Sequence, residues 1–155
     1  MSKGFVIRMK STEAVELATK EIDSYSKAVQ SRIRGVIRKG TMAIYDSAVR
    51  MAPMGDTGKL KQGIRFRSAN DWQTGEVVST APHSRVVEMG TGPRITYPNP
   101  KLGKRHAMKM PDGRYVKGDI YNGHMTKHPF MRPAYLKEKD KIEAAMKEAI
   151  EHDTD

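Results

Sequence analysis

Cysteine is absent from this 155-residue chain, which excludes disulfide bonds, thiolate-bound zinc and cysteine nucleophiles together. No apolar run approaches the roughly 18 residues that suggest a membrane-spanning helix. The N-terminus also lacks the apolar core of a secretory signal peptide. These absences predict a cytoplasmic protein without membrane contact, whose stability comes from packing and assembly.

Aromatic residues are scarce as well. They make up 6% of the chain, and apolar residues in total 37%, below the usual share of roughly 45–50% in globular proteins. The predicted core is therefore modest, with some apolar surface completed by neighbouring subunits. Eleven methionines supply adaptable side chains that suit irregular cores and interfaces alike. The length fits a single domain, residues 1–155.

Positive charge is abundant and unevenly distributed. The formal net charge is +10, and residues 92–128 alone hold eight basic residues against two acidic ones, a net charge of +6. The basic residues of this segment are Arg94, Lys101, Lys104, Arg105, Lys109, Arg114, Lys117 and Lys127. Such a balance favours contact with polyanions or with acidic protein surfaces.

A long N-terminal helix is predicted over residues 11–51, where apolar residues recur at spacings of three and four. Ser11 is its predicted N-cap, and Pro53 prevents its continuation. Gly35 and Gly40 weaken the helix, so the pattern predicts a kink or break there.

A second helix is predicted over residues 129–152, after the opening Pro129-Phe130-Met131-Arg132-Pro133-Ala134. Phe130 and Met131 suit the docking of its first turn against the sheet, as core residues. Its Lys and Glu residues form the predicted solvated face. The predicted apolar side consists of Tyr135, Leu136, Ile142, Ala145, Met146 and Ala149.

The segment 56–91 is predicted to contain a turn, a hairpin and one short element. Asp56-Thr57-Gly58 forms a tight turn that directs Leu60 into the core. Residues 63–68 alternate apolar and basic side chains as a half-buried strand does, and residues 76–80 return as its partner. Residues 83–89 form a short helix or strand that stops at Gly90, where the backbone conformation opposes a side chain.

Residues 92–128 are rich in Pro, Gly, Lys and Arg and have little apolar patterning. Pro111-Asp112-Gly113 nevertheless predicts a hairpin turn within residues 108–116. A loop this long in a small domain is usually either functional or disordered. The complete prediction is an α+β fold in which a long N-terminal helix and a C-terminal helix pack on a small antiparallel β-sheet, with a long basic loop or hairpin insertion.

Catalytic chemistry is not indicated. The sequence has no phosphate-cradling glycine loop, no nucleophile elbow and no recognisable carboxylate pair. His128 precedes Pro129, a position biased away from helix, so it is not secured on one helical face with the histidine four residues before it. The ligands of an imagined nuclease metal site are His106, Asp112, Asp119, His124 and His128. We predict a protein that is not an enzyme and has no cofactor or metal.

Non-specific DNA binding is the alternative function. The basic segment also carries Tyr97, Tyr115 and Tyr121. Its Lys and Arg side chains can neutralise phosphates, and its tyrosines can stack on exposed bases. No helix-turn-helix or zinc-finger pattern supports sequence-specific recognition. A flexible, solvated loop that orders only against an acidic neighbouring protein is an equally open alternative for residues 92–128.

Several short motifs follow one another in a characteristic order. They are Met51-Ala52-Pro53, Asp56-Thr57-Gly58-Lys59-Leu60, the strand at Ile64, Ala81-Pro82-His83, Val87-Glu88-Met89-Gly90-Thr91, and Pro129 to Ala134. From about Gly40 to the C-terminus this order resembles the small tail-component family of long-tailed double-stranded DNA bacteriophages, whose members act in the neck as head–tail joining or tail-completion subunits. The sequence departs from the family at Met89, where members commonly carry an aromatic residue, and in the basic insertion after Gly92.

The resemblance implies a structural virion protein of the head–tail junction, assembled in the host cytoplasm into a closed ring. It implies six copies, with the connector's twelvefold symmetry as the alternative. The implied partners are the head connector or adaptor and the tail tube or tail terminator, with non-specific contact to DNA in the channel. The motif residues expected to have structural roles are Pro53, Asp56, Thr57, Gly58, Leu60, Glu88, Gly90, Thr91, Pro129, Phe130, Pro133 and Ala134. For Glu88 two roles stay open: accepting hydrogen bonds from backbone amides, or pairing with a basic residue of an adjacent subunit.

Overall fold

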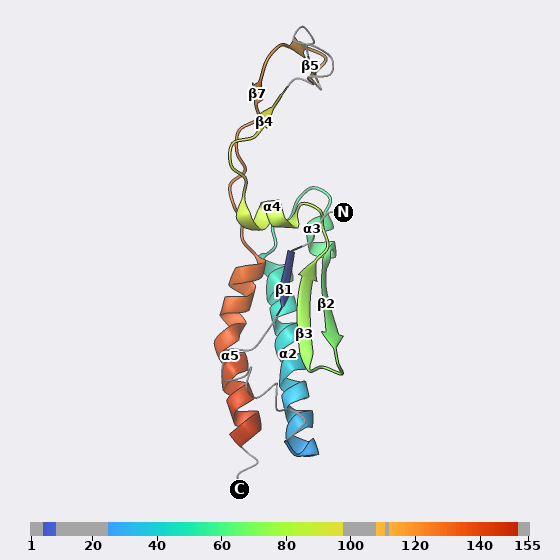
Figure 1. Cartoon of the computed structure of the whole chain (residues 1–155), viewed down its shortest axis with the longest axis vertical. Coiled ribbons are helices and arrows are strands. Elements are labelled where there is room, and N and C mark those ends of the chain that lie inside the picture. Colours follow the sequence, from blue (N-terminus) through green and yellow to red (C-terminus); the bar gives the residue numbers. More distant parts are fainter. Residues whose placement is uncertain (1–4, 9–24, 98–107, 111, 152–155) are drawn as a thin grey trace.

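The computed structural model describes residues 5–8, 25–97, 108–110 and 112–151. Two long antiparallel helices lie side by side against a small sheet (Figure 1). The helices are α2 (Lys27–Met51) and α5 (Met131–Glu151). The sheet has the order β1-β3-β2, all antiparallel, with β1 (Phe5–Arg8), β2 (Ile64–Ala69) and β3 (Thr74–Ser79). The predicted α+β architecture is confirmed.

Helix α2 begins later than the periodicity suggested. Its N-cap is Ser26, whose backbone is extended and whose hydroxyl accepts a hydrogen bond from the amide of Val29 at 3.4 Å. A helix continuous from Ser11 through Ser26 is therefore wrong, while Ser11 itself lies outside the described residues. At the other end the amide of Ala52 donates to the carbonyl of Ala48 at 2.8 Å, and Pro53 follows, as predicted.

The predicted break in α2 is also wrong, because the helix runs without interruption through Gly35 and Gly40. A Cβ atom built on Gly40 would lie 2.8 Å from Cγ1 of Ile142 on α5, whereas one on Gly35 would meet nothing within 4 Å. Gly40 therefore permits a close approach of the two helices. The tertiary contact replaces the helix stability that glycine forfeits.

The predicted hairpin is present. Strands β2 and β3 pair in a register that sets Ile64 opposite Ser79, and the turn between them contains three successive residues with positive φ, at Asn70, Asp71 and Trp72. Within β2 only Ile64 is buried; the ring of Phe66 stays 40% exposed although it contacts Tyr45 edge-on. The half-buried alternation was thus correct for one of its two apolar positions.

The core is divided between two clusters. One lies between the end of α2, the hairpin and the start of α5; it contains Ile44, Ala48, Ala52, Leu60, Ile64, Val77, Ala81, Val87, Phe130, Met131 and Ala134. The other joins the start of α2 to the end of α5 through Val29, Ile33, Ile37 and Met146. Leu60 follows Gly58, which has a φ of 61°, so the predicted turn does direct it into the core.

Helix α5 presents a slightly different face from the predicted one. Met146 and Ala149 are buried, and Tyr135, Ile142 and Ala145 are half-buried. Leu136, however, is 53% exposed, and Glu138 is buried instead. The assignment of Leu136 to the apolar side was wrong because the helix is rotated towards Ala134 and Glu138, which lie one turn apart on the face that meets α2.

Candidate assembly surface

Residues 92–128 are here called the arm. Their described parts, residues 92–97, 108–110 and 112–128, follow α4 (Ser84–Met89), precede α5 and extend away from both helices (Figure 1). Its described parts form two short antiparallel ladders. Strand β4 (Ile95–Thr96) pairs with β7 (Ile120–Tyr121), and β5 (Met108–Lys109) pairs with β6 (Tyr115–Val116). The second ladder is the hairpin predicted within residues 108–116.

The base of the arm is fixed to the body by backbone contacts. Gly90 ends α4 with a φ of 72°, and a Cβ atom there would lie 2.8 Å from the carbonyl oxygen of Met125. Thr91 bonds Met125 twice: its amide donates to the Met125 carbonyl at 3.0 Å, and its hydroxyl accepts from the Met125 amide at 2.8 Å. The amide of His128 donates to the carbonyl of Val87 at 2.8 Å. The two ends of the arm are thereby held together against α4.

Glu88 holds the start of α5. Its buried carboxylate accepts hydrogen bonds from the amides of Phe130, Met131 and Arg132 at 2.8, 3.0 and 2.9 Å. The next residue, Pro133, has no N–H, and the intrahelical bonds begin with Ala134 donating to Phe130. The amides that a helix N-terminus leaves without an intrahelical acceptor are thus all bonded by one side chain, whose negative charge also suits the helix dipole.

Two roles were left open for Glu88. Its contacts match the first of them, in which the carboxylate accepts hydrogen bonds from backbone amides. Glu88 as a whole residue is 6% exposed, which leaves little of it for a basic residue of a neighbouring subunit. The contacts also join two motifs, Val87 to Thr91 and Pro129 to Ala134, that lie far apart in the sequence. In these motifs Phe130 and Ala134 are buried, Gly90, Thr91 and Pro133 are half-buried, and Pro129 is exposed.

The motif at residues 53–60 is not joined by polar contacts to the structure that Glu88 forms with the start of α5. Pro53, Asp56 and Thr57 are exposed, and Gly58 is half-buried. Leu60 enters the core cluster that also contains Phe130, as does Ala52, the residue before Pro53. The motif order along the chain therefore reflects two separate structural units. One is the turn that places Leu60 in the core, and the other is the set of hydrogen bonds from the start of α5 to Glu88.

The described basic residues of the arm point to solvent: Arg94, Lys109, Arg114, Lys117 and Lys127 are all exposed. Arg114 is paired with Asp112 through an Nη2–Oδ2 contact of 2.6 Å, and hydrogen bonds from Arg114 lower the pKa of the Asp112 carboxyl. Lys101, Lys104 and Arg105 lie outside the described residues. The three arm tyrosines are exposed as well, at 64% for Tyr97, 67% for Tyr115 and 63% for Tyr121.

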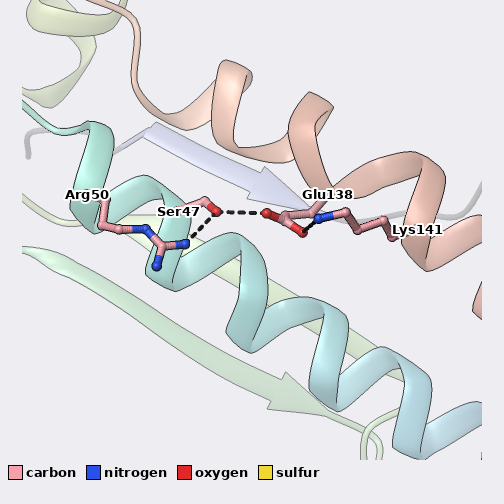
Figure 2. A network of polar contacts seen from close by, with 4 residues as sticks. All are labelled: Ser47, Arg50, Glu138 and Lys141. Atoms are coloured by element: carbon pink, nitrogen blue, oxygen red, sulfur yellow. Dashed lines mark hydrogen bonds and ion pairs between the residues drawn. The ribbon is translucent and has the colours of Figure 1, made fainter.

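A partly buried polar network between α2 and α5 was not predicted from the sequence. The hydroxyl of Ser47 donates to Oε1 of Glu138 at 3.0 Å and accepts from Nη2 of Arg50 at 3.3 Å, while Nζ of Lys141 lies 3.4 Å from Oε2 of Glu138 (Figure 2). The hydrogen bond from Ser47, with help from Lys141, lowers the pKa of Glu138. The burial of Glu138 could have been predicted from its position in the sequence. Glu138 lies four residues from both Ala134 and Ile142 and is therefore on the apolar side of the helix.

Among the described residues, no three His, Cys, Asp or Glu side chains gather in a way that could hold a metal ion. His106, one of the imagined ligands, lies outside that part of the chain. In the same described part, no helix has both the length and the apolar character needed to cross a membrane.

These features define a small α+β protein with an arm that projects from the body and is fixed to it by hydrogen bonds at its base. Residues 18–90 match the family model described as Bacteriophage HK97-gp10, putative tail-component, and this segment is therefore similar to bacteriophage tail components. The resemblance is confirmed over α2, the hairpin and α4, and it starts before Gly40, where it was expected to begin. Its expected continuation to Pro129–Ala134 lies outside the matched residues. No curated protein and no solved structure matches the chain.

Proposed function

We propose that the protein is a structural subunit of the head–tail junction of a tailed bacteriophage, where copies assemble into a ring and join the head connector to the tail. The observation that carries this proposal is the match of residues 18–90 to a tail-component family. The role is mechanical and not enzymatic. Its partners in the virion are the head connector or adaptor and the tail tube or tail terminator.

Ring formation is supported by the exposed apolar surface. Among the described residues of the body, four methionines have more than a third of their surface exposed, namely Met42, Met51, Met54 and Met89. Methionine is enriched in protein interfaces and adapts to irregular partners. A closed ring needs a heterologous interface, in which one patch of each copy meets a different patch of the next. We propose six copies, with twelve as the alternative.

The test has two parts. Light scattering of the purified chain at low and high salt, followed by electron microscopy, is expected to show rings, either of the free protein or after addition of tails. A phage lacking the gene is expected to produce separate heads and tails that the purified chain joins. Absence of the chain from purified virions, or normal joining without it, would contradict the proposal.

Non-specific DNA binding is the second candidate function, favoured by the exposed basic residues and tyrosines of the arm. Binding of this kind depends on phosphate neutralisation, so the affinity for duplex DNA should fall steeply with salt. Fluorescence anisotropy with a labelled duplex at two salt concentrations measures this. A strict monomer that binds duplex DNA at low salt and is absent from virions would favour this candidate.

A further inference from the structure

We propose that the arm docks into an apolar groove bordered by acidic residues on a different virion protein. The partner is neither DNA nor a second copy of this chain. This inference rests on the proposed head–tail junction function and specifies which surface makes the joint. It starts from side chains of the arm that the rest of the fold leaves uncovered.

The arm has an exposed apolar face. Ile95 and Tyr121 are directly opposite in the β4–β7 ladder, so their side chains project from the same face of the ribbon; they are 44% and 63% exposed. Six of the twelve exposed large apolar residues of the described chain belong to the arm: Ile95, Tyr97, Tyr115, Val116, Tyr121 and Met125. Half of the uncovered apolar side chains thus lie on a segment that extends away from the body (Figure 1).

The arm does not bury these side chains itself. None of its described residues belongs to either core cluster, and each of its ladders is two residues long. An isolated two-stranded ribbon is marginally stable in water. Its base, by contrast, is held at Thr91 and Met125, and the amide of Arg94 donates to the Gly123 carbonyl at 2.9 Å. A fixed base that carries an unsupported apolar face is suited to insertion into a partner that supplies the missing burial.

Charge argues against a second copy as that partner. The arm carries +6 of the net charge of +10, and the remainder of the chain is itself positive, at +4. Bringing the arm of one copy onto the body of another would oppose charges of the same sign, whereas an acidic surface attracts the arm. The partner is therefore a chemically different, acidic surface.

The apolar side chains favour protein over nucleic acid. Ile95, Val116 and Met125 can neither neutralise a phosphate nor stack on a base as an aromatic ring does, and the charge of Arg114 is already balanced by Asp112. Protein interfaces combine aromatic and methionine side chains at the centre with charged residues at the rim. The exposed rim residues are Arg94, Lys109, Lys117 and Lys127.

Cross-linking in virions tests the identity of the partner. A photo-reactive amino acid replaces Tyr121 in the full-length chain, and a control chain carries it in place of Leu136, a body side chain of similar exposure. We expect position 121, but not position 136, to cross-link to another virion protein through a segment with net negative charge. Cross-links from position 121 to DNA or to a second copy of this chain, or no cross-link, would overturn the inference.

Paired variants test the contribution of the apolar face. Ile95→Ser with Tyr121→Ser removes this face and keeps every charge, and Leu136→Ser is the control on the body. We expect the arm pair to lower the yield of joined particles about tenfold or more with an unchanged melting temperature, and Leu136→Ser to stay within about twofold.

The outcomes separate this inference from the proposed function. Normal joining by the arm pair, or an equal loss with Leu136→Ser, would overturn the docking assignment while the junction function stands. If the unsubstituted chain is absent from virions, or is not needed for joining, the proposed function fails and this inference fails with it.

Discussion

Glu88 accepts hydrogen bonds from three consecutive backbone amides at a helix start that begins 42 positions away in the sequence. The carboxylate simultaneously fixes the end of α4 and the beginning of α5. Since the arm leaves from one of these elements and returns to the other, its direction relative to the body depends on this residue.

Glu88→Ala is expected to lower the free energy of unfolding by about 2–4 kcal/mol, since three amide donors lose their acceptor in a buried place. Urea denaturation followed by circular dichroism measures the change. Arg85→Ala, an exposed position on the same helix, is the control and should change stability by less than about 0.5 kcal/mol. A loss in Glu88→Ala no larger than in the control would contradict the role described for the carboxylate.

Glu138 makes stability depend on pH. Its pKa is lowered from the ordinary value of 4.5, first by the hydrogen bond from Ser47. A carboxyl whose folded pKa is depressed contributes stability that is present above its unfolded pKa and is lost as the pH falls through the folded pKa. Ser47→Ala is therefore expected to cost about 1–2 kcal/mol at pH 7 and distinctly less at pH 3.

Denaturant unfolding at the two pH values measures this difference, and Glu138→Gln serves as the control. The glutamine keeps the size of the side chain but cannot titrate, so adding Ser47→Ala to it should cost the same at both pH values. A cost of Ser47→Ala that stays constant between pH 7 and pH 3 in the unsubstituted background would show that the hydroxyl does not act through the charge of Glu138.

Within α2, two glycines with the same helix propensity have opposite structural meanings. Gly35 faces open space, whereas Gly40 lies against Ile142 of α5. Periodicity and propensity assign both a weakening effect, and they cannot tell which glycine allows another helix to approach. The continuity of α2 through Gly40 is therefore a property of the packed helix pair and not of the helix sequence alone.

Gly35→Ala is expected to stabilise the protein by about 0.5–1 kcal/mol, because alanine gains helix propensity without a steric conflict. Gly40→Ala is expected to destabilise it by about 1–2 kcal/mol, because overpacking against Ile142 outweighs the same gain. Thermal unfolding compares the two. Ile142→Val, which removes one of the crowding methyl groups, should reduce the penalty of Gly40→Ala; an undiminished penalty would place the conflict elsewhere.

Considered as a whole molecule, the protein has a packed body and an arm whose described residues contribute nothing to either core cluster. The two parts meet at Thr91 and Met125, whose hydrogen bonds hold the ends of the arm side by side. This geometry predicts that stability and joining can be separated experimentally.

Replacement of residues 93–124 by a short Gly-Ser connection is expected to change the free energy of unfolding of the body by less than about 1 kcal/mol and to leave ring formation intact. Joining of heads to tails should be lost, because the proposed docking surface is gone. Urea denaturation, electron microscopy and a joining assay measure the three properties. Unfolding of the shortened chain at markedly lower urea would show that the arm supports the body.

Periodicity and turn residues were sufficient to predict both long helices, the hairpin and the turn at Gly58, because apolar spacing and turn chemistry act over a few residues. It placed the start of α2 too early, because a stripe of apolar spacing does not reveal where a cap such as Ser26 interrupts it. The basic composition of residues 92–128 was likewise visible, but not the pairing of β4 with β7, whose strands are separated by a long stretch of chain.

The sequence alone established an α+β protein with the motifs of a phage tail component, since those properties depend on residue types and local spacing. Only the tertiary structure decided that Glu88 bonds the start of α5, that Glu138 is buried beside Ser47, and that Gly40 admits Ile142. Each of these contacts joins segments far apart in the chain, and their geometry depends on how the helices pack against each other and on α4. Local patterns carry no information about that packing.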